Sequence, residues 1–134
     1  MRMLACLIAM AAVTACTTTG RDADIAEVRR LNAASATADA QKVIDGADED
    51  PASQCVVFLG ISRHHRSTRF DLTEAGMDRA QALWKAHLRK TMSEQEMDQL
   101  TGSSVNMLEP ADPATRDAAS RWCVQNAPGA NMGG

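Results

Sequence analysis

Residues 71–92 read DLTEAGMDRAQALWKAHLRKTM, and this stretch has the clearest helical pattern in the chain. Asp71 and Glu74 form a capping-box-like start, and the basic residues near the end suit the helix dipole. Small and apolar side chains recur at helical spacing along one face; they are Leu72, Gly76, Ala80, Leu83, Trp84, His87 and Leu88. The stretch therefore predicts an amphipathic helix with Leu83, Trp84 and Leu88 in a core.

The segments on either side also predict helices. Asp50-Pro51 is a helix-start signal, and a helix from Pro51 to about residue 63 places four side chains on one face: Cys55, Phe58, Leu59 and Ser62. The run CVVFLGI within it also fits a strand, because it is short, apolar and β-branched. The Asp-Pro start and the side-chain spacing favour the helix.

Three further helices are expected. Ser93 and Glu96 have the spacing of a capping box, and predict a short helix over about 94–101 that Gly102-Ser103-Ser104 breaks. Asp112-Pro113 starts a helix over about 113–126, which Pro128 stops. A weaker pattern predicts a helix over 23–44, ended by Gly46.

The first sixteen residues have the layout of an export signal. Arg2 is the only charge before Arg21, and residues 3–15 are apolar or small. That run is too short to cross a hydrocarbon core, which needs about 20 residues. Its end, Val13-Thr14-Ala15-Cys16, resembles the lipobox of bacterial lipoproteins. The resemblance implies a signal peptide over 1–15 and a Cys16 that carries acyl chains such as palmitate and anchors the mature chain to a membrane.

The residue after the cysteine and two other processing routes bear on localisation. Among lipoproteins that this signal resembles, Asp after the lipidated cysteine favours the inner membrane, so Thr17 is compatible with the outer membrane, facing the periplasm. The same residues also fit cleavage by the ordinary signal peptidase, which would leave a soluble periplasmic protein with a free Cys16. A chain that is not exported is the third alternative.

The cysteines follow from this compartment. The chain has four. The lipobox resemblance implies that Cys6 leaves with the signal peptide and that Cys16 is the lipidated residue. Cys55 and Cys123 remain, and an oxidising periplasm favours a disulfide between them. Such a bridge would stabilise a domain whose core is small.

Together these features predict an all-α protein, a small bundle of four to five short helices joined by one disulfide. The signal peptide covers 1–15, and the lipidated cysteine with a flexible tether covers 16–24. A helix and an acidic linker follow over 25–49, the helical domain spans 50–127, and a flexible, disordered tail covers 128–134.

Composition and motifs exclude several functions. Aromatic residues make up 3% of the chain and the net charge is −3, which argues against a nucleic-acid-binding face. The chain has no nucleophile elbow, P-loop, His-Glu-x-x-His or Cys-x-x-Cys, so we expect no enzyme and no cofactor. A metal site from His64, His65 and His87 is also not expected, because adjacent helical residues diverge by about 100°.

One polar cluster stands out as a possible binding surface. Five basic or titratable side chains fall within seven residues: Arg63, His64, His65, Arg66 and Arg69. Such a cluster fits an acidic partner or an anionic surface, although a solvated helix end is the simpler explanation. If it is a recognition surface without a structural role, neutralising its three arginines should weaken binding and leave stability nearly unchanged.

The predicted function is a membrane-anchored, non-catalytic interaction or structural module of the bacterial envelope, with an envelope protein as partner. Small helical periplasmic proteins with a Cys-to-Cys bridge include immunity proteins and stress chaperones, so an inhibitor-type, immunity-type or chaperone-type binder is an alternative by analogy. A soluble secreted protein is a second alternative.

Overall fold

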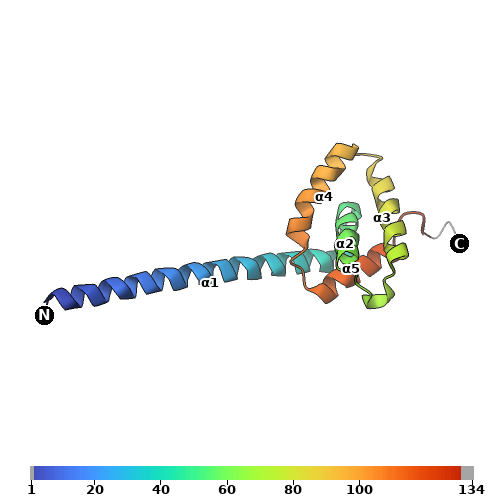
Figure 1. Ribbon diagram of the computed structural model, residues 1–134. Helices are drawn as coiled ribbons and strands as arrows, with labels where there is room; N and C mark the ends of the chain where they lie inside the picture. The colour runs from blue at the N-terminus through green and yellow to red at the C-terminus, as the bar shows by residue number, and fades with distance from the viewer. Residues whose placement is uncertain (1, 131–134) are drawn as a thin grey trace. The chain divides into compact units, whose positions relative to one another are not determined.

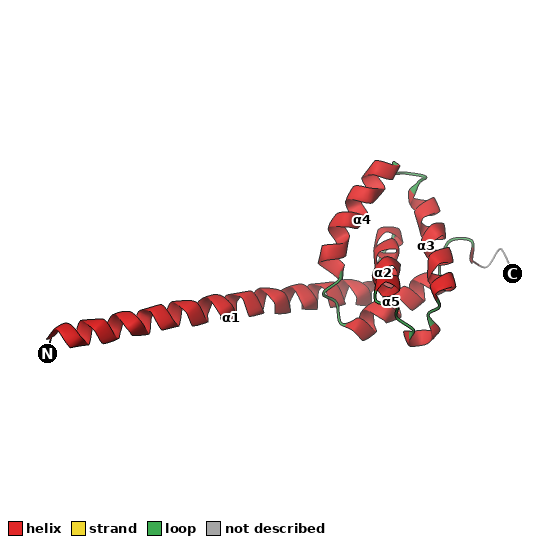
Figure 2. Cartoon of the chain, in the orientation of Figure 1, coloured by secondary structure: helices red, strands yellow, loops and turns green. Residues whose placement is uncertain are grey.

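The structure, a computed structural model, describes the backbone of residues 2–130 and the side chains of residues 20–130. The described part is all-α, without strands (Figures 1 and 2). It contains α1 (Arg2–Ile44), α2 (Ala52–His64), α3 (Glu74–Leu88), α4 (Glu94–Leu108) and α5 (Pro113–Gln125), with a 3-10 turn η1 (Arg69–Asp71) before α3. The expected all-α bundle is therefore confirmed.

The chain divides into two compact units, residues 1–31 and residues 32–134, and α1 contributes to both. In the first unit all described side chains are exposed, including Ile25, Val28 and Leu31. Arg30 and Glu27 form a surface ion pair there, with 2.6 Å between Nη2 and Oε1. The lipobox side chains, Cys16 among them, lie outside the described residues.

The tether predicted over 16–24 does not separate from the following helix. Residues 20–24 are helical. The helix expected to begin near residue 23 is therefore the C-terminal part of α1, with no break before it. The stretch contains no proline, and a single Gly20 is too weak an interruption to end a helix. The predicted end is correct, because α1 stops at Ile44 and Gly46 follows at a φ of +65°.

The core of the second unit is built around α2, which packs against α3, α4 and α5 (Figure 1). Phe58 and Leu59 are fully buried. The helix predicted for this segment is confirmed, and the strand alternative is wrong. The helix begins one residue later than expected, at Ala52, whose N–H donates to Asp50 Oδ1 over 3.4 Å.

The predicted disulfide is present and lies in this core. Cys55 of α2 is bonded to Cys123 of α5, with 5.5 Å between the Cα atoms and 68 positions between the residues. Trp84 of α3 is 5% exposed, and its Nε1–H donates to the carbonyl oxygen of Cys123 over 2.9 Å. Its ring stacks on that of Trp122. The prediction that Trp84 is a core residue is therefore confirmed.

The N-cap predicted for α3, Asp71, is wrong by two residues. Asp71 has a φ of +59°, which excludes it from a right-handed helix. Thr73 caps the helix instead, and its Oγ1 accepts from the Gly76 N–H over 3.0 Å. The helix ends at Leu88, four residues before the end near residue 92 that the sequence pattern predicts.

The break predicted in α4 is also wrong. The capping box of Ser93 and Glu96 is present, but the helix continues through Gly102-Ser103-Ser104 to Leu108. One helical glycine costs about 1 kcal/mol relative to alanine. Burying Leu108, which is 4% exposed, contributes about 1.5–3 kcal/mol and outweighs that cost.

The C-terminal helix begins as predicted and the folded part extends past it. Asp112 caps α5 by accepting from the Thr115 N–H over 3.0 Å. Beyond the helix, Ala127 is buried and Ala130 packs against the core, so the fold reaches three residues beyond the predicted boundary at 127. Residues 131–134 of the predicted tail lie outside the described residues.

Candidate binding site around residues 66–73

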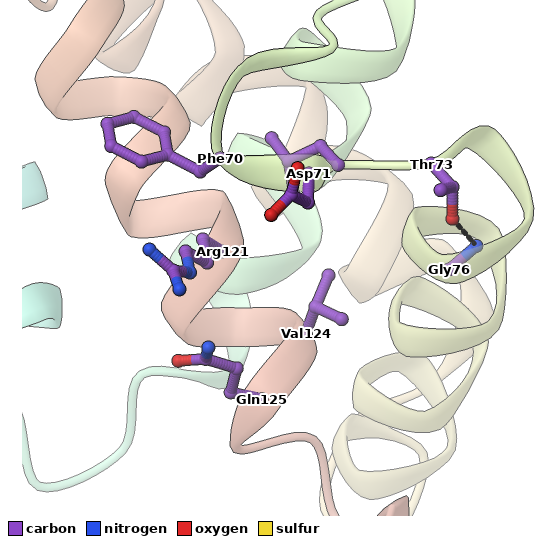
Figure 3. Close-up of a pocket in the computed structure, with 8 residues that line it drawn as sticks. Phe70, Asp71, Thr73, Gly76, Arg121, Val124 and Gln125 are labelled. Carbon is purple, nitrogen blue, oxygen red and sulfur yellow. Dashed lines mark hydrogen bonds between the residues drawn. The ribbon is translucent and has the colours of Figure 1, made fainter.

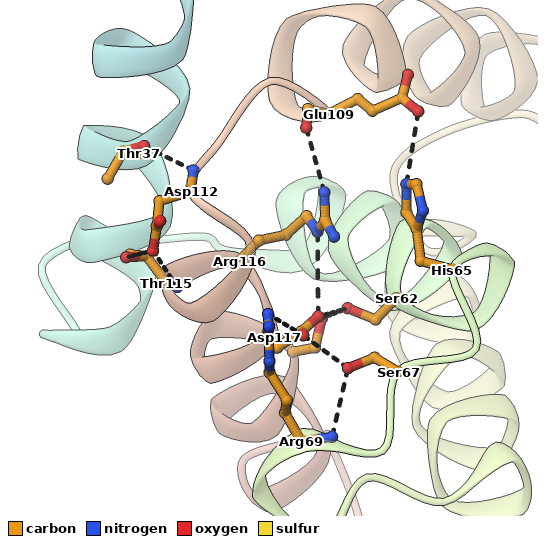
Figure 4. A network of polar contacts seen from close by, with 11 residues as sticks. Thr37, Ser62, His65, Ser67, Arg69, Glu109, Asp112, Thr115, Arg116 and Asp117 are labelled. Carbon is orange, nitrogen blue, oxygen red and sulfur yellow. Dashed lines mark hydrogen bonds and ion pairs between the residues drawn. The ribbon is translucent and has the colours of Figure 1, made fainter.

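A buried polar cluster lies between α2 and α5, beside the loop that follows α2 (Figure 4). Asp117 is 2% exposed and Ser62 and Ser120 are fully buried. Ser62 Oγ donates to Asp117 Oδ1 over 2.9 Å and lies 2.7 Å from Ser120 Oγ. Both hydroxyls are sealed inside the protein, so they do not face solvent.

The same carboxylate holds the loop over residues 66–73, called here the 66–73 loop. Ser67 Oγ donates to Asp117 Oδ2 over 2.6 Å, and Arg69 Nη1 lies 3.6 Å from that oxygen. On the other side Arg116 Nε lies 4.0 Å from Oδ1, and its Nη1 donates to the Glu109 carbonyl oxygen over 3.3 Å. A buried charge needs such partners, and here they tie the loop to α5.

Sequence analysis did not identify this cluster, although the disulfide carries a signal for it. If α2 and α5 run antiparallel from the Cys55–Cys123 bridge, a residue seven positions after Cys55 lies opposite a residue about seven positions before Cys123. That register brings Ser62 to Arg116 and Asp117. The structure shows this pairing, so the bridge and one direction of packing were sufficient to find it.

The predicted basic surface is divided among different partners. Arg63 Nη1 donates to Gln81 Oε1 over 2.8 Å and lies 3.1 Å from Asp78 Oδ1. His65 Nε2 lies 3.6 Å from Glu109 Oε1, and Arg69 faces Asp117 as described. The expectation that these side chains lack structural partners is therefore wrong for Arg63, His65 and Arg69, because acidic side chains on α3, at the C-cap of α4 and on α5 lie within 4.0 Å of them. The effect of neutralising the arginines on stability stays a prediction.

His64 and Arg66 are the exposed members of that cluster for which the described residues provide no acidic partner within 4.0 Å. Arg63 and Arg66 line a hollow of about 520 Å³ on one side of the 66–73 loop. Glu74 and the hydroxyl-bearing residues Ser67, Thr68 and Thr73 also line it. The binding role of this surface stays a prediction.

Three residues of the loop that are not glycine have a positive φ. Arg66, at +51°, follows the C-cap of α2. The N–H groups of Ser67 and Arg66 donate to the carbonyls of Ser62 and Arg63, a pattern that closes a helix and normally uses glycine at the position of Arg66. Its conformation is explained by helix termination.

The other two have no such explanation. Phe70 has φ +57° and ψ +32°, and Asp71 has φ +59°. The Leu72 N–H closes a four-residue turn on the Arg69 carbonyl oxygen over 3.1 Å. This geometry resembles a type I′ turn, which favours glycine and asparagine. A bulky residue in this region costs about 1–2 kcal/mol, and strain of this kind concentrates at functional sites.

The turn forms one wall of a cleft whose other wall is α5 (Figure 3). The cleft has a volume of about 280 Å³. Phe70 remains 41% exposed at its edge, with the Arg121 guanidinium 6.0 Å from the ring centroid. The lining residues are Phe70, Asp71, Leu72, Thr73, Gly76, Arg121, Val124 and Gln125.

The remaining candidate residues are those that could ligate a metal ion. Among residues 20–130 no three His, Cys, Asp or Glu side chains are grouped to hold a metal ion. His87 lies at the rim of the core, 39% exposed, with Nε2 3.6 Å from Asp50 Oδ1. In the part of the chain that was described, none of the helices has the length and apolar character to cross a membrane.

Comparison with protein-family models, curated proteins and solved structures found no match for this chain.

Proposed function

We propose that this chain is a lipoprotein of the bacterial envelope, anchored through acyl chains on Cys16, whose helical domain binds a partner without catalysing a reaction. The observation that carries the proposal is the buried Cys55–Cys123 disulfide. It pairs the two cysteines that remain after a signal-peptide Cys6 and a lipidated Cys16, and disulfides form in oxidising compartments such as the periplasm.

The contacts of the polar residues support binding over catalysis. The Ser62 and Ser120 hydroxyls are fully buried, so neither can reach a substrate. Ser67 uses its hydroxyl to hold the loop against Asp117. The exposed features of the 66–73 loop instead include an aromatic ring and arginine side chains, which are enriched at protein interfaces.

Cys16→Ser tests the anchor. Two or more acyl chains bind a bilayer stably, so we expect the wild-type chain in the membrane fraction with the mass of an acylated Cys16. The variant should be soluble or remain as uncleaved precursor. An unmodified Cys16 in the wild-type protein would contradict the anchor and support a soluble secreted protein.

A partner is sought by affinity capture from detergent-solubilised envelope, followed by mass spectrometry. Phe70→Ala removes the exposed ring at the edge of the cleft, and Met107→Ala is the matched control because Met107 is an exposed apolar side chain on α4. A protein retained by the wild type and by Met107→Ala, but not by Phe70→Ala, supports the proposal. Retention of the same proteins by all three argues against recognition at this loop.

The strained turn also favours the second candidate, an inhibitor-type or immunity-type binder. A rigid loop loses little conformational entropy when it binds, and Ser67 and Arg69 fix this loop to a buried carboxylate. Addition of the purified protein to a captured envelope hydrolase distinguishes the two, because an inhibitor abolishes its activity and a structural partner does not.

A further inference from the structure

The cleft between the Phe70–Asp71 turn and α5 carries two opposite charges on its walls. Asp71 and Arg121 are both exposed, and among residues 20–130 neither has an ion-pair partner within 4.0 Å. Figure 3 shows the Asp71 carboxylate and the Arg121 side chain at the same opening, with Phe70 on one side and Gln125 on the other. Arg69 of the same loop is held by the buried Asp117, whereas Asp71 and Arg121 are available to a ligand.

The interior of the cleft is apolar. Leu72, which is 6% exposed, and Val124 line it together with Gly76. A side chain at Gly76 would narrow it and would also place a Cβ 2.8 Å from the Thr73 hydroxyl that caps α3. A volume of about 280 Å³ lies just below the ~300–1,000 Å³ of sites for drug-sized molecules. The occupant is therefore small.

We propose that this cleft binds a small zwitterion, a free amino acid or a dipeptide. The ammonium group pairs with Asp71, the carboxylate pairs with Arg121, and the aliphatic part lies against Leu72 and Val124. This role also explains the strained turn, because a relaxed turn would not hold the Asp71 carboxylate and the Phe70 ring at this opening.

The inference is independent of the lipid anchor and deepens the proposed binding role. The test uses the full chain in a non-ionic detergent, with ¹⁵N amide spectra recorded during titration with alanyl-alanine. We expect saturable shifts centred on Asp71, Gly76 and Arg121. N-acetyl-alanyl-alanine lacks the ammonium group and alanyl-alaninamide lacks the carboxylate, and each should bind about tenfold more weakly, the effect of losing one charge-assisted hydrogen bond.

Two variants assign each charge to its partner. In Arg121→Gln the free acid and the amide should bind equally, and in Asp71→Asn the free and acetylated dipeptides should bind equally. Asparagine tolerates positive φ, so this substitution keeps the turn. Lys90→Gln is the control with the same loss of charge as Arg121→Gln, since Lys90 is exposed and lines neither hollow of the loop.

The titration distinguishes three outcomes, which are binding of an amino acid, binding of a dipeptide, and no specific binding. Alanine that binds as tightly as alanyl-alanine identifies an amino acid as the ligand, and weaker binding of alanine identifies a dipeptide. Absence of saturable shifts overturns the inference, as does binding that Arg121→Gln and Lys90→Gln alter equally. Membrane release of the chain in the fractionation experiment would affect only the anchor and leave this result unchanged.

Discussion

Trp84 is held in the core by both ring packing and a hydrogen bond. It is 5% exposed, stacks on Trp122 and donates to the Cys123 carbonyl oxygen. Its truncation leaves a cavity and also leaves that carbonyl without its side-chain donor.

We expect Trp84→Ala to lower the free energy of unfolding by about 3–5 kcal/mol, measured by urea denaturation. Trp122→Ala is the control, because that ring is half-buried and its loss should cost less. Equal losses for the two variants would contradict the assignment of Trp84 to the core.

Ser67 tests how the candidate site is held. Its hydroxyl joins the 66–73 loop to the buried Asp117 carboxylate, and a hydrogen bond to a charged group contributes about 1.5–3 kcal/mol.

Ser67→Ala should therefore lower stability by about that amount and accelerate amide hydrogen exchange of Leu72, whose N–H closes the strained turn. Ser103→Ala is the control, since its exposed hydroxyl contacts only the carbonyl of its own helix. Unchanged exchange at Leu72 would show that the hydrogen bond from Ser67 to Asp117 does not fix the turn.

Glycine has opposite effects on stability inside a helix and at a helix end in this chain. Gly102 lies inside α4, where a Cβ would meet nothing within 4 Å. Gly46 ends α1 at a φ of +65°, and the Ala47 N–H donates to the Lys42 carbonyl oxygen across it.

Gly102→Ala should raise the free energy of unfolding by about 0.5–1 kcal/mol, and Gly46→Ala should lower it by about 1–2 kcal/mol. Thermal denaturation of the two variants checks the signs. A stabilising Gly46→Ala would mean that α1 does not end in the left-handed conformation.

The capping box of α4 makes the stability of the protein dependent on pH. Ser93 N–H donates to Glu96 Oε2 over 2.8 Å, and the hydrogen bonds from the Ser93 backbone and side chain lower the pKa of Glu96. Because the folded-state pKa lies below the unfolded value, the cap stabilises fully above the ordinary pKa of about 4.3 and is lost as pH falls through the lowered one.

In NMR titration of the carboxyl groups we expect Glu96 to titrate below its ordinary pKa. The stability of Glu96→Gln should fall less on acidification than that of the wild type. Glu49→Gln, at an exposed position outside the helices, serves as the control and should follow the wild type.

At the scale of the whole molecule, the disulfide closes a loop between positions 68 apart, and such a cross-link contributes about 4 kcal/mol in the chain-entropy model. A variant with both Cys55→Ala and Cys123→Ala should lose about this much stability in urea. Cys16→Ser, measured in parallel, should lose none. Full stability of the double variant would show that packing around Phe58 and Trp84 is sufficient without the bridge.

The sequence by itself determined the helices and the bridge. Periodicity, the Ser93–Glu96 box, Asp112-Pro113 and Gly46 are local signals, because capping and helical spacing involve residues within one or two turns. The pairing of Cys55 with Cys123 followed from the count of cysteines and the expected compartment. The buried positions of Trp84, Phe58 and Leu59 followed from the same periodicity.

Only the tertiary structure decided the boundaries and the site. Whether Gly102 breaks α4 depends on the burial of Leu108, and whether Asp71 caps α3 depends on a turn held from α5. The basic segment looked unpaired because its partners Asp78, Glu109 and Asp117 are distant in sequence. The cleft requires Asp71 and Arg121, fifty positions apart, to share one opening, and long-range packing alone determines that arrangement.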